Sequence, residues 1–99
     1  MTRQGTLHLT ALGARVLGTD AIGWDRPFAV MTRQYRFDGT PLWDGHKAIR
    51  EREAFIVQKL TNLGALPLSG FHVGFFPLKL ARASAAPARV VAFVSTPSE

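Results

Sequence analysis

The sequence contains no cysteine. This absence excludes disulfides, thiolate metal ligands and a cysteine nucleophile, and it is typical of a protein from a reducing compartment. No apolar run approaches the roughly 18 residues that a membrane-spanning helix needs. The polar start, Met1 to Gln4, is not followed by the apolar core of a signal peptide. We therefore expect a soluble, cytoplasmic protein without a membrane partner.

Acidic residues are scarce: 7 Asp and Glu stand against 12 Lys and Arg, which gives a net charge of +5. Such an excess of positive charge is a common feature of nucleic-acid-binding proteins. Here, however, the basic residues are scattered singly along the chain, and no known nucleic-acid-binding motif is present. A nucleophile elbow, a P-loop and a dinucleotide fingerprint are missing as well. We therefore expect no nucleic-acid partner.

What is present indicates a folded chain. Its 99 residues form at most one domain. Apolar residues make up 46% and charged residues 19% of the sequence, which are ordinary values for a globular protein. Helix-favouring and strand-favouring segments alternate, so we predict an α/β fold, bordering on α+β, with a mixed sheet and one or two short helices.

The predicted elements follow from periodicity, turn residues and helix-ending glycines. The segment 28–35 could be either a short helix or a strand, and it lies in a long irregular stretch, 19–44. The remaining predictions are a helix over 5–13 ending at Gly13, a strand over 14–17, a helix over 46–53, a strand over 54–60, turns over 62–70, a strand over 71–80 with Pro77 at a bulge or an edge, a loop over 81–88, a strand over 89–94 buried on both faces, and a frayed tail over 95–99.

His46 is the first candidate for chemistry, because it follows Asp44 and Gly45 at the start of a predicted helix. A rigid helix could aim its imidazole into a cleft, and Glu53 would share its helix face. The competing interpretation is a solvated helix face of mixed charge. The other two histidines, His8 among leucines and His72 in an aromatic strand, are predicted to be packed structural residues. None of the three forms a known two-histidine metal motif.

Thr19 and Asp20 are the second candidate. They follow Gly18 at the end of a predicted strand, where polar side chains often form a site. Both residue types also stabilise turns and helix caps through local hydrogen bonds. The sequence leaves these two interpretations open.

Several segments, in order, resemble the carboxy-terminal half of the cyclase family, metal-dependent hydrolases related to bacterial kynurenine formamidase. The similarity runs from about Leu9 to Val94. The matching segments are Gly18–Ala21, Trp24–Phe28, Gly45–Ala48, Lys59–Leu63 with Leu66 and Pro67, Gly70–Phe71, Phe76–Leu80, Ala83–Ala85 and Arg89–Ala92.

The resemblance implies a swivelling β/β/α fold and a divalent metal, zinc or manganese, in the hydrolysis of a small amide or ester. Such a metal activates a bound water and polarises the carbonyl group. Most ligands of the family, and a catalytic histidine, come from an amino-terminal HxGTHxDxPxH motif, which this sequence lacks. We therefore expect residues 1–99 to form a single partial domain, and we assign no catalytic residue within it.

The resemblance places His46 at a metal-ligand position and Gln58 where the family has a glutamate twelve residues later. A glutamine offers an acceptor oxygen but no charge, so it would hold a divalent cation less tightly. By the same comparison, Thr19 and Asp20 would lie near the substrate. Two functions follow from this resemblance.

The first is a cyclase-like hydrolase of small molecules, truncated or split and inactive alone, which an amino-terminal-half partner chain would complete. The alternative is a catalytically dead remnant or interaction subunit without a metal. Under either function, the chain would expose strand edges and apolar surface. We therefore expect it to form a homo-oligomer or to bind a partner chain.

Overall fold

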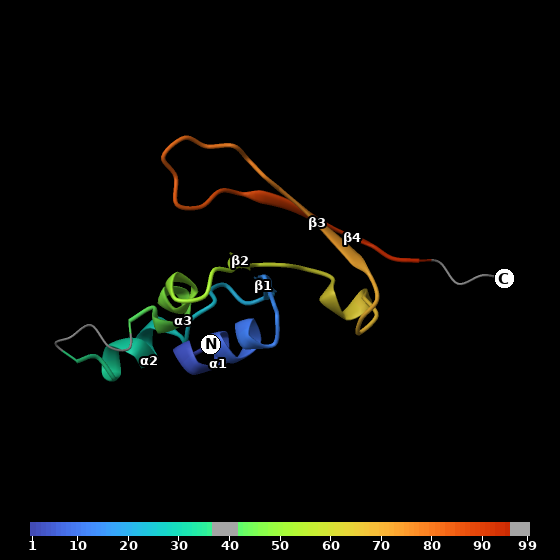
Figure 1. The fold of residues 1–99 in the computed structure, drawn as a ribbon. Helices are drawn as coiled ribbons and strands as arrows, with labels where there is room; N and C mark the ends of the chain where they lie inside the picture. The colour runs from blue at the N-terminus through green and yellow to red at the C-terminus, as the bar shows by residue number, and fades with distance from the viewer. Residues whose placement is uncertain (37–41, 96–99) are drawn as a thin grey trace. The chain divides into compact units, whose positions relative to one another are not determined.

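The computed structural model describes residues 1–36 and 42–95 (Figure 1). Within these residues, helices and strands are mixed, and the strands form two sheets of two strands each. The α/β class predicted from the sequence is confirmed. In place of one mixed sheet, one pair of strands is parallel and the other antiparallel. The chain divides into two compact units, unit 1 (Met1–Thr61) and unit 2 (Asn62–Glu99).

Helix α1 (Arg3–Ala11) opens unit 1. The Oγ1 atom of Thr2 accepts a hydrogen bond from the backbone N–H of Gly5 at 3.0 Å, which caps the first turn. After the helix, Gly13 adopts a φ of 102°, a left-handed conformation that favours glycine. The prediction of a helix that ends at Gly13 is confirmed, with a start two residues earlier.

The parallel pair lies in unit 1 and joins β1 (Val16–Gly18) to β2 (Phe55–Val57), with Leu17 opposite Ile56. Strand β2 lies within the strand predicted over 54–60, whereas β1 overlaps the strand predicted over 14–17 and extends to Gly18. The core at this sheet consists of Leu17, Trp24 and Ala54, and it is surrounded by the half-buried side chains of Leu9, Ala14, Ile49 and Ile56. This small core fixes the positions of the loops that follow the two strands.

The connection from β1 to β2 contains helix α2 (Phe28–Arg33), which decides the open prediction for that segment in favour of a helix. Residues 37–41 lie outside the described part. Helix α3 (Asp44–Lys47) then continues as the 3₁₀ turn η1 (Ala48–Arg50). The prediction of one helix over 46–53 is wrong at both ends. The helix begins at Asp44, and the helical turns end at Arg50, after which the chain turns to bring Ala54 into the core. Consequently Glu53 does not share a helix face with His46.

Unit 2 contains the 3₁₀ turn η2 (Leu63–Ala65) and the hairpin of β3 (His72–Pro77) and β4 (Ala88–Phe93). The two hairpin strands are antiparallel, and Pro77 ends β3, in agreement with an edge position. The prediction that the last strand is buried on both faces is wrong. Its residues are exposed or half-buried, and β3 is its one pairing partner within the described residues. Of the predicted tail, 96–99 lies outside the described part.

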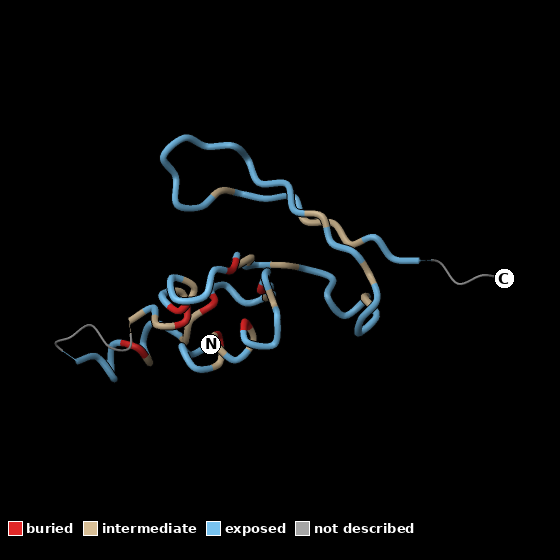
Figure 2. Tube along the Cα trace, in the orientation of Figure 1, coloured by how far each residue is buried: buried red, intermediate tan, exposed pale blue. Residues whose placement is uncertain are grey.

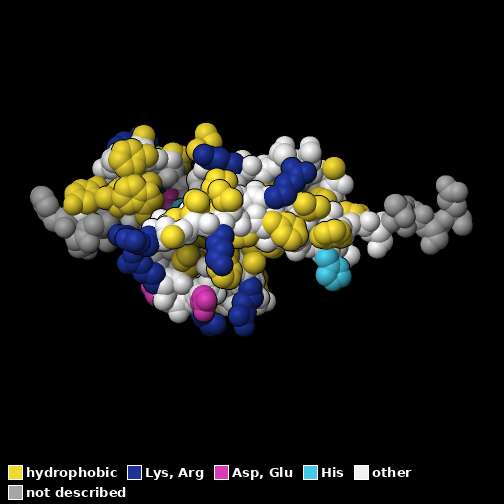
Figure 3. Space-filling view, turned by 90° about the horizontal axis from the view of Figure 1, so that it is seen from above, with side chains coloured by type: hydrophobic (Ala, Val, Ile, Leu, Met, Phe, Trp, Pro, Cys, Tyr) yellow, Lys and Arg dark blue, Asp and Glu magenta, His cyan; other side chains and the backbone are white. Residues whose placement is uncertain are grey.

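Burial differs sharply between the units (Figure 2). All buried residues of the described chain belong to unit 1, and residues 62–95 are exposed or half-buried throughout. Figure 3 shows many hydrophobic side chains on the surface that it draws, together with Lys and Arg and few acidic residues. No helix among the described residues is long and apolar enough to cross a membrane.

Candidate functional site

Trp24 connects three parts of unit 1. Its side chain is buried, and its indole N–H donates a hydrogen bond to Oγ1 of Thr6 at 3.0 Å. Its backbone N–H donates to Oε1 of Gln58 at 3.0 Å, just after β2. Thr6 is itself fully buried in α1, where its hydroxyl donates to the carbonyl oxygen of Thr2 at 2.8 Å. One tryptophan therefore links α1, the loop after β1 and the end of β2.

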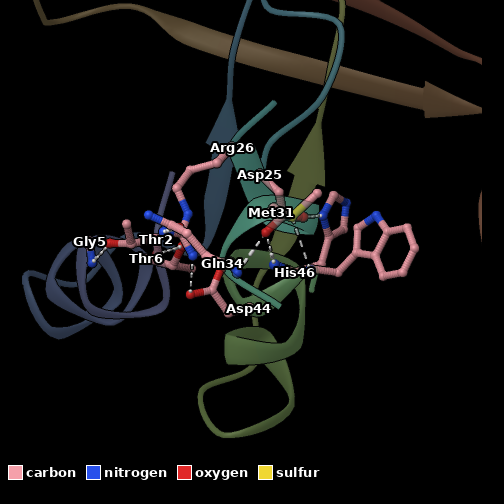
Figure 4. Close-up of polar contacts among 11 residues, drawn as sticks. Thr2, Gly5, Thr6, Asp25, Arg26, Met31, Gln34, Asp44 and His46 are labelled. Carbon is pink, nitrogen blue, oxygen red and sulfur yellow. Dashed lines mark hydrogen bonds and ion pairs between the residues drawn. The ribbon is translucent and has the colours of Figure 1, made fainter. Parts of the chain in front are cut away.

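Asp25, the next residue, holds the start of α3 (Figure 4). Its Oδ1 accepts hydrogen bonds from the backbone N–H groups of Gly45, at 2.6 Å, and His46, at 3.2 Å. Its Oδ2 contacts Nδ1 of the His46 ring. The Asp25 side chain is only 5% exposed, whereas that of His46 is 37% exposed. Asp25 thus fixes both the backbone and the ring of His46.

The contact with Asp25 decides which ring nitrogen of His46 can bind a ligand or a proton. A carboxylate only accepts hydrogen bonds, so Nδ1 of His46 carries the proton that faces Asp25. In the neutral ring, Nε2 then keeps its lone pair and is the nitrogen left for a ligand or a proton. Histidines that bind metals, or that act as bases, commonly have such a carboxylate partner.

Arg26 reinforces the same junction from the other side. It donates to Oε1 of Gln34 at 2.7 Å and forms an ion pair with Asp44 at 3.2 Å. Both side chains of the ion pair are about three-quarters buried. Asp25 and Arg26, adjacent in sequence, therefore both hold the first turn of α3.

An open cavity of about 350 Å³ lies beside His46 and is lined by Trp43, His46, Lys47 and Arg50. Trp43 has a φ of 51°, a strained conformation for a bulky residue, and its ring lies 6.1 Å from that of Phe28. Lys47 and Arg50 give the cavity a positive charge. Such a charge disfavours a divalent cation and favours an anion.

The side chains present do not fit the divalent metal that the resemblance implies. The predicted ligand Gln58 uses its amide oxygen to hold the backbone of Trp24, and His46 offers only Nε2. Lys47 and Arg50 add unfavourable charge beside it. Across residues 1–36 and 42–95, no three His, Cys, Asp or Glu side chains gather closely enough to hold an ion.

The other candidate residues lie at the surface or in a turn, outside the network around His46. The hydroxyl of Thr19 accepts a hydrogen bond from the backbone N–H of Ala21 at 3.1 Å, as in a turn, and Asp20 is exposed. Their proximity to a substrate stays a prediction. His8 and His72 are exposed, so the prediction that they are packed is wrong. His8 turns outward from α1, while the buried face of that helix carries Thr6 and Thr10.

Asp25 and Thr6 are the residues that sequence reasoning missed. Their partners, His46 and Trp24, lie 21 and 18 residues away along the chain. The sequence could have indicated only that such partners exist, because a buried indole N–H or an oriented imidazole needs a polar partner. The chain matches no family model, no curated protein and no solved structure. The resemblance to the cyclase family therefore stays a prediction.

Proposed function

We propose that the chain is an interaction subunit, which works by binding another polypeptide and holds no metal of its own. The observation that carries this proposal is the lack of any buried residue within residues 62–95. Large hydrophobic side chains are exposed there instead. They are Leu63, Leu68, Val73, Phe75, Phe76, Leu78, Leu80, Phe93 and Val94.

Such a unit gains little stability from itself. An isolated two-stranded hairpin is at best marginally stable in water, because it has no second layer to bury its apolar side chains. Burial of apolar surface contributes about 25 cal/mol per Å², and a partner would supply that burial. Large exposed apolar patches commonly mark protein interfaces.

The polar network of unit 1 supports the metal-free part of the proposal. Gln58 and His46, the two residues aligned with metal ligands, each have a structural task. Gln58 accepts a hydrogen bond from Trp24, and His46 is held by Asp25. Their positions in the sequence are thus explained by the folding of unit 1, without a bound ion.

A second candidate function is a cyclase-like hydrolase of small amides or esters, in which this chain contributes His46 and a partner supplies the other ligands. One observation favours it: the Asp25 carboxylate orients the His46 ring as in many metal-bound histidines. A metal bound there would supply an activated water. The chain itself would contribute only the orientation of one imidazole.

Equilibrium dialysis of the chain against zinc and manganese separates the two functions. We expect substoichiometric binding that is unchanged in His46→Ala, with His8→Ala, an exposed histidine, as the matched control. Gln58→Glu preserves the acceptor for Trp24 and adds the family's charge, and we expect no gain in affinity. Stoichiometric metal lost only in His46→Ala would contradict the proposal, as would hydrolysis of N-formylkynurenine by the chain alone.

A further inference from the structure

The hairpin of unit 2 has two chemically different faces. Side chains alternate between the faces along each strand, and directly paired residues share a face. The register pairs Val73 with Ala92, Phe75 with Val90 and Pro77 with Ala88, so one face, the apolar face, is built from these six residues. The opposite face carries the cationic or ionisable residues His72 and Arg89, together with Gly74, Phe76, Val91 and Phe93.

The hydrogen-bond pattern defines which backbone groups point outward. The N–H of Leu78 donates to the carbonyl oxygen of Pro87 at 2.9 Å, just beyond the paired strands. In an antiparallel ladder, hydrogen-bonded and non-hydrogen-bonded pairs alternate. Phe76 and Arg89 therefore form a hydrogen-bonded pair, as do the pairs at every second position toward His72. The N–H and C=O groups of Ala88, Val90 and Ala92 consequently point away from β3.

The two outer edges of the hairpin are not equivalent. The outward groups of β3 belong to Val73, Phe75 and Pro77, and proline has no N–H to donate. The outer edge of β4 has a donor and an acceptor at all of its outward positions. No further strand pairs with either edge within the described residues. The β4 edge is thus the better template for an added strand.

The charge of the described part of unit 2 indicates the chemistry of that strand. Residues 62–95 contain Lys79, Arg82 and Arg89 and no acidic residue. A second copy of the chain would bring the same basic β4 to this edge. A segment with acidic side chains would instead complement it.

We propose that the outer edge of β4 binds an extended segment of a partner protein as a third strand, and that this segment alternates apolar and acidic residues. The inference rests on the proposed function as an interaction subunit. The apolar side chains of the segment extend the apolar face, and its acidic side chains lie on the face of Arg89. The outward groups of Ala88, Val90 and Ala92 supply the backbone hydrogen bonds.

The test uses the full chain and a fluorescent peptide of about eight residues, a typical strand length, that alternates valine and glutamate. Fluorescence anisotropy measures its affinity. Val90→Pro removes one outward N–H of β4, and we expect affinity to fall about tenfold or more, equivalent to about one lost backbone hydrogen bond. Val73→Pro is the matched control, since it removes an outward N–H of β3, and we expect less than about a twofold change.

The nuclear Overhauser contacts between Phe76 and Arg89 show whether each variant keeps its hairpin. A second measurement needs no variant: N-methylation of the peptide on its pairing edge should abolish binding, and methylation on its other edge should not. Equal binding of a valine–lysine peptide would overturn the proposal, as would equal losses in the two proline variants. Self-association through β4, or binding to anionic vesicles with no binding of the peptide, would also overturn it.

The two proposals fail separately. A peptide that does not bind overturns the β4 assignment and leaves the metal-free interaction subunit standing. Stoichiometric metal in the dialysis experiment overturns the proposed function, whatever the peptide does.

Discussion

The two units of the chain differ in the interactions that hold each of them together. Unit 1 contains buried apolar side chains and joins its segments through polar contacts made by Trp24 and Asp25. Unit 2 contains one antiparallel hairpin, and none of its described residues is buried. Both units are rich in apolar residues, so composition does not explain the difference. What differs is whether the apolar side chains have something to pack against.

This comparison explains where a function can lie. In unit 1 the polar side chains that looked suited to chemistry, His46 and Gln58, are used to hold the fold. Within the described residues of unit 2, the outer strand edges are unpaired and no apolar side chain is buried. Under the proposed function, the hairpin is the surface that binds a partner, and the residues aligned with metal ligands serve to hold unit 1 together.

We expect the largest effect on the stability of unit 1 from Trp24→Ala. We expect a loss of about 3–5 kcal/mol in the free energy of unfolding of unit 1, because the change leaves a cavity and removes the hydrogen bond to Thr6. Urea unfolding followed by circular dichroism measures this loss. The hairpin resonances of unit 2 should stay unchanged.

Trp43→Ala is the matched control, because this second tryptophan is 48% exposed. Its loss should cost about 1 kcal/mol, the value of its aromatic contact with Phe28. Equal destabilisation by the two substitutions would show that the core of unit 1 is not centred on Trp24.

We expect a smaller loss of stability in unit 1 from a substitution at Gly45. A Cβ atom at this position would lie 2.7 Å from Oδ1 of Asp25 and 3.0 Å from the carbonyl oxygen of Met1. Gly45→Ala should therefore displace the Asp25 carboxylate and destabilise unit 1 by about 1–3 kcal/mol, as overpacking does. Thermal unfolding and the ring ¹⁵N shifts of His46 report the two changes.

The control for this substitution lies in the other unit. A Cβ at Gly64 would meet no atom within 4 Å. Gly64→Ala should leave stability nearly unchanged. A similar loss at Gly64 would mean that unit 2 is as tightly packed as unit 1, which would contradict the difference in burial between the units.

Much of the secondary structure was predictable because its signals are local. The helix that ends at Gly13 and the strands around Leu17 and Ile56 follow from apolar pattern and glycine position. The helix predicted over 46–53 extends past Arg50, where the helical turns end. Residue propensities say nothing of the tertiary packing that buries Ala54. The last strand was predicted as buried because a continuous apolar run is typical of buried strands, whether or not a second layer exists.

The site was less predictable than the fold. His46 stood out by its position, but its contact with Asp25 spans 21 residues of sequence. The role of Gln58 depended on the backbone of Trp24, which has no sequence signature at all. Local patterns cannot indicate such contacts, because they arise only when β1 and β2 pair and bring the following loops together.

Residue-resolved hydrogen exchange of the chain alone compares the stability of both units in one sample. We predict slow exchange for the paired amides of β1 and β2, such as that of Phe55, which donates to the carbonyl oxygen of Arg15 at 2.9 Å. The hairpin amides of Gly74 and Val91 should exchange far faster, and they should become protected when the acidic peptide binds. Equal protection of both units in a dilute monomer would contradict the conclusion that unit 2 depends on a partner for its stability.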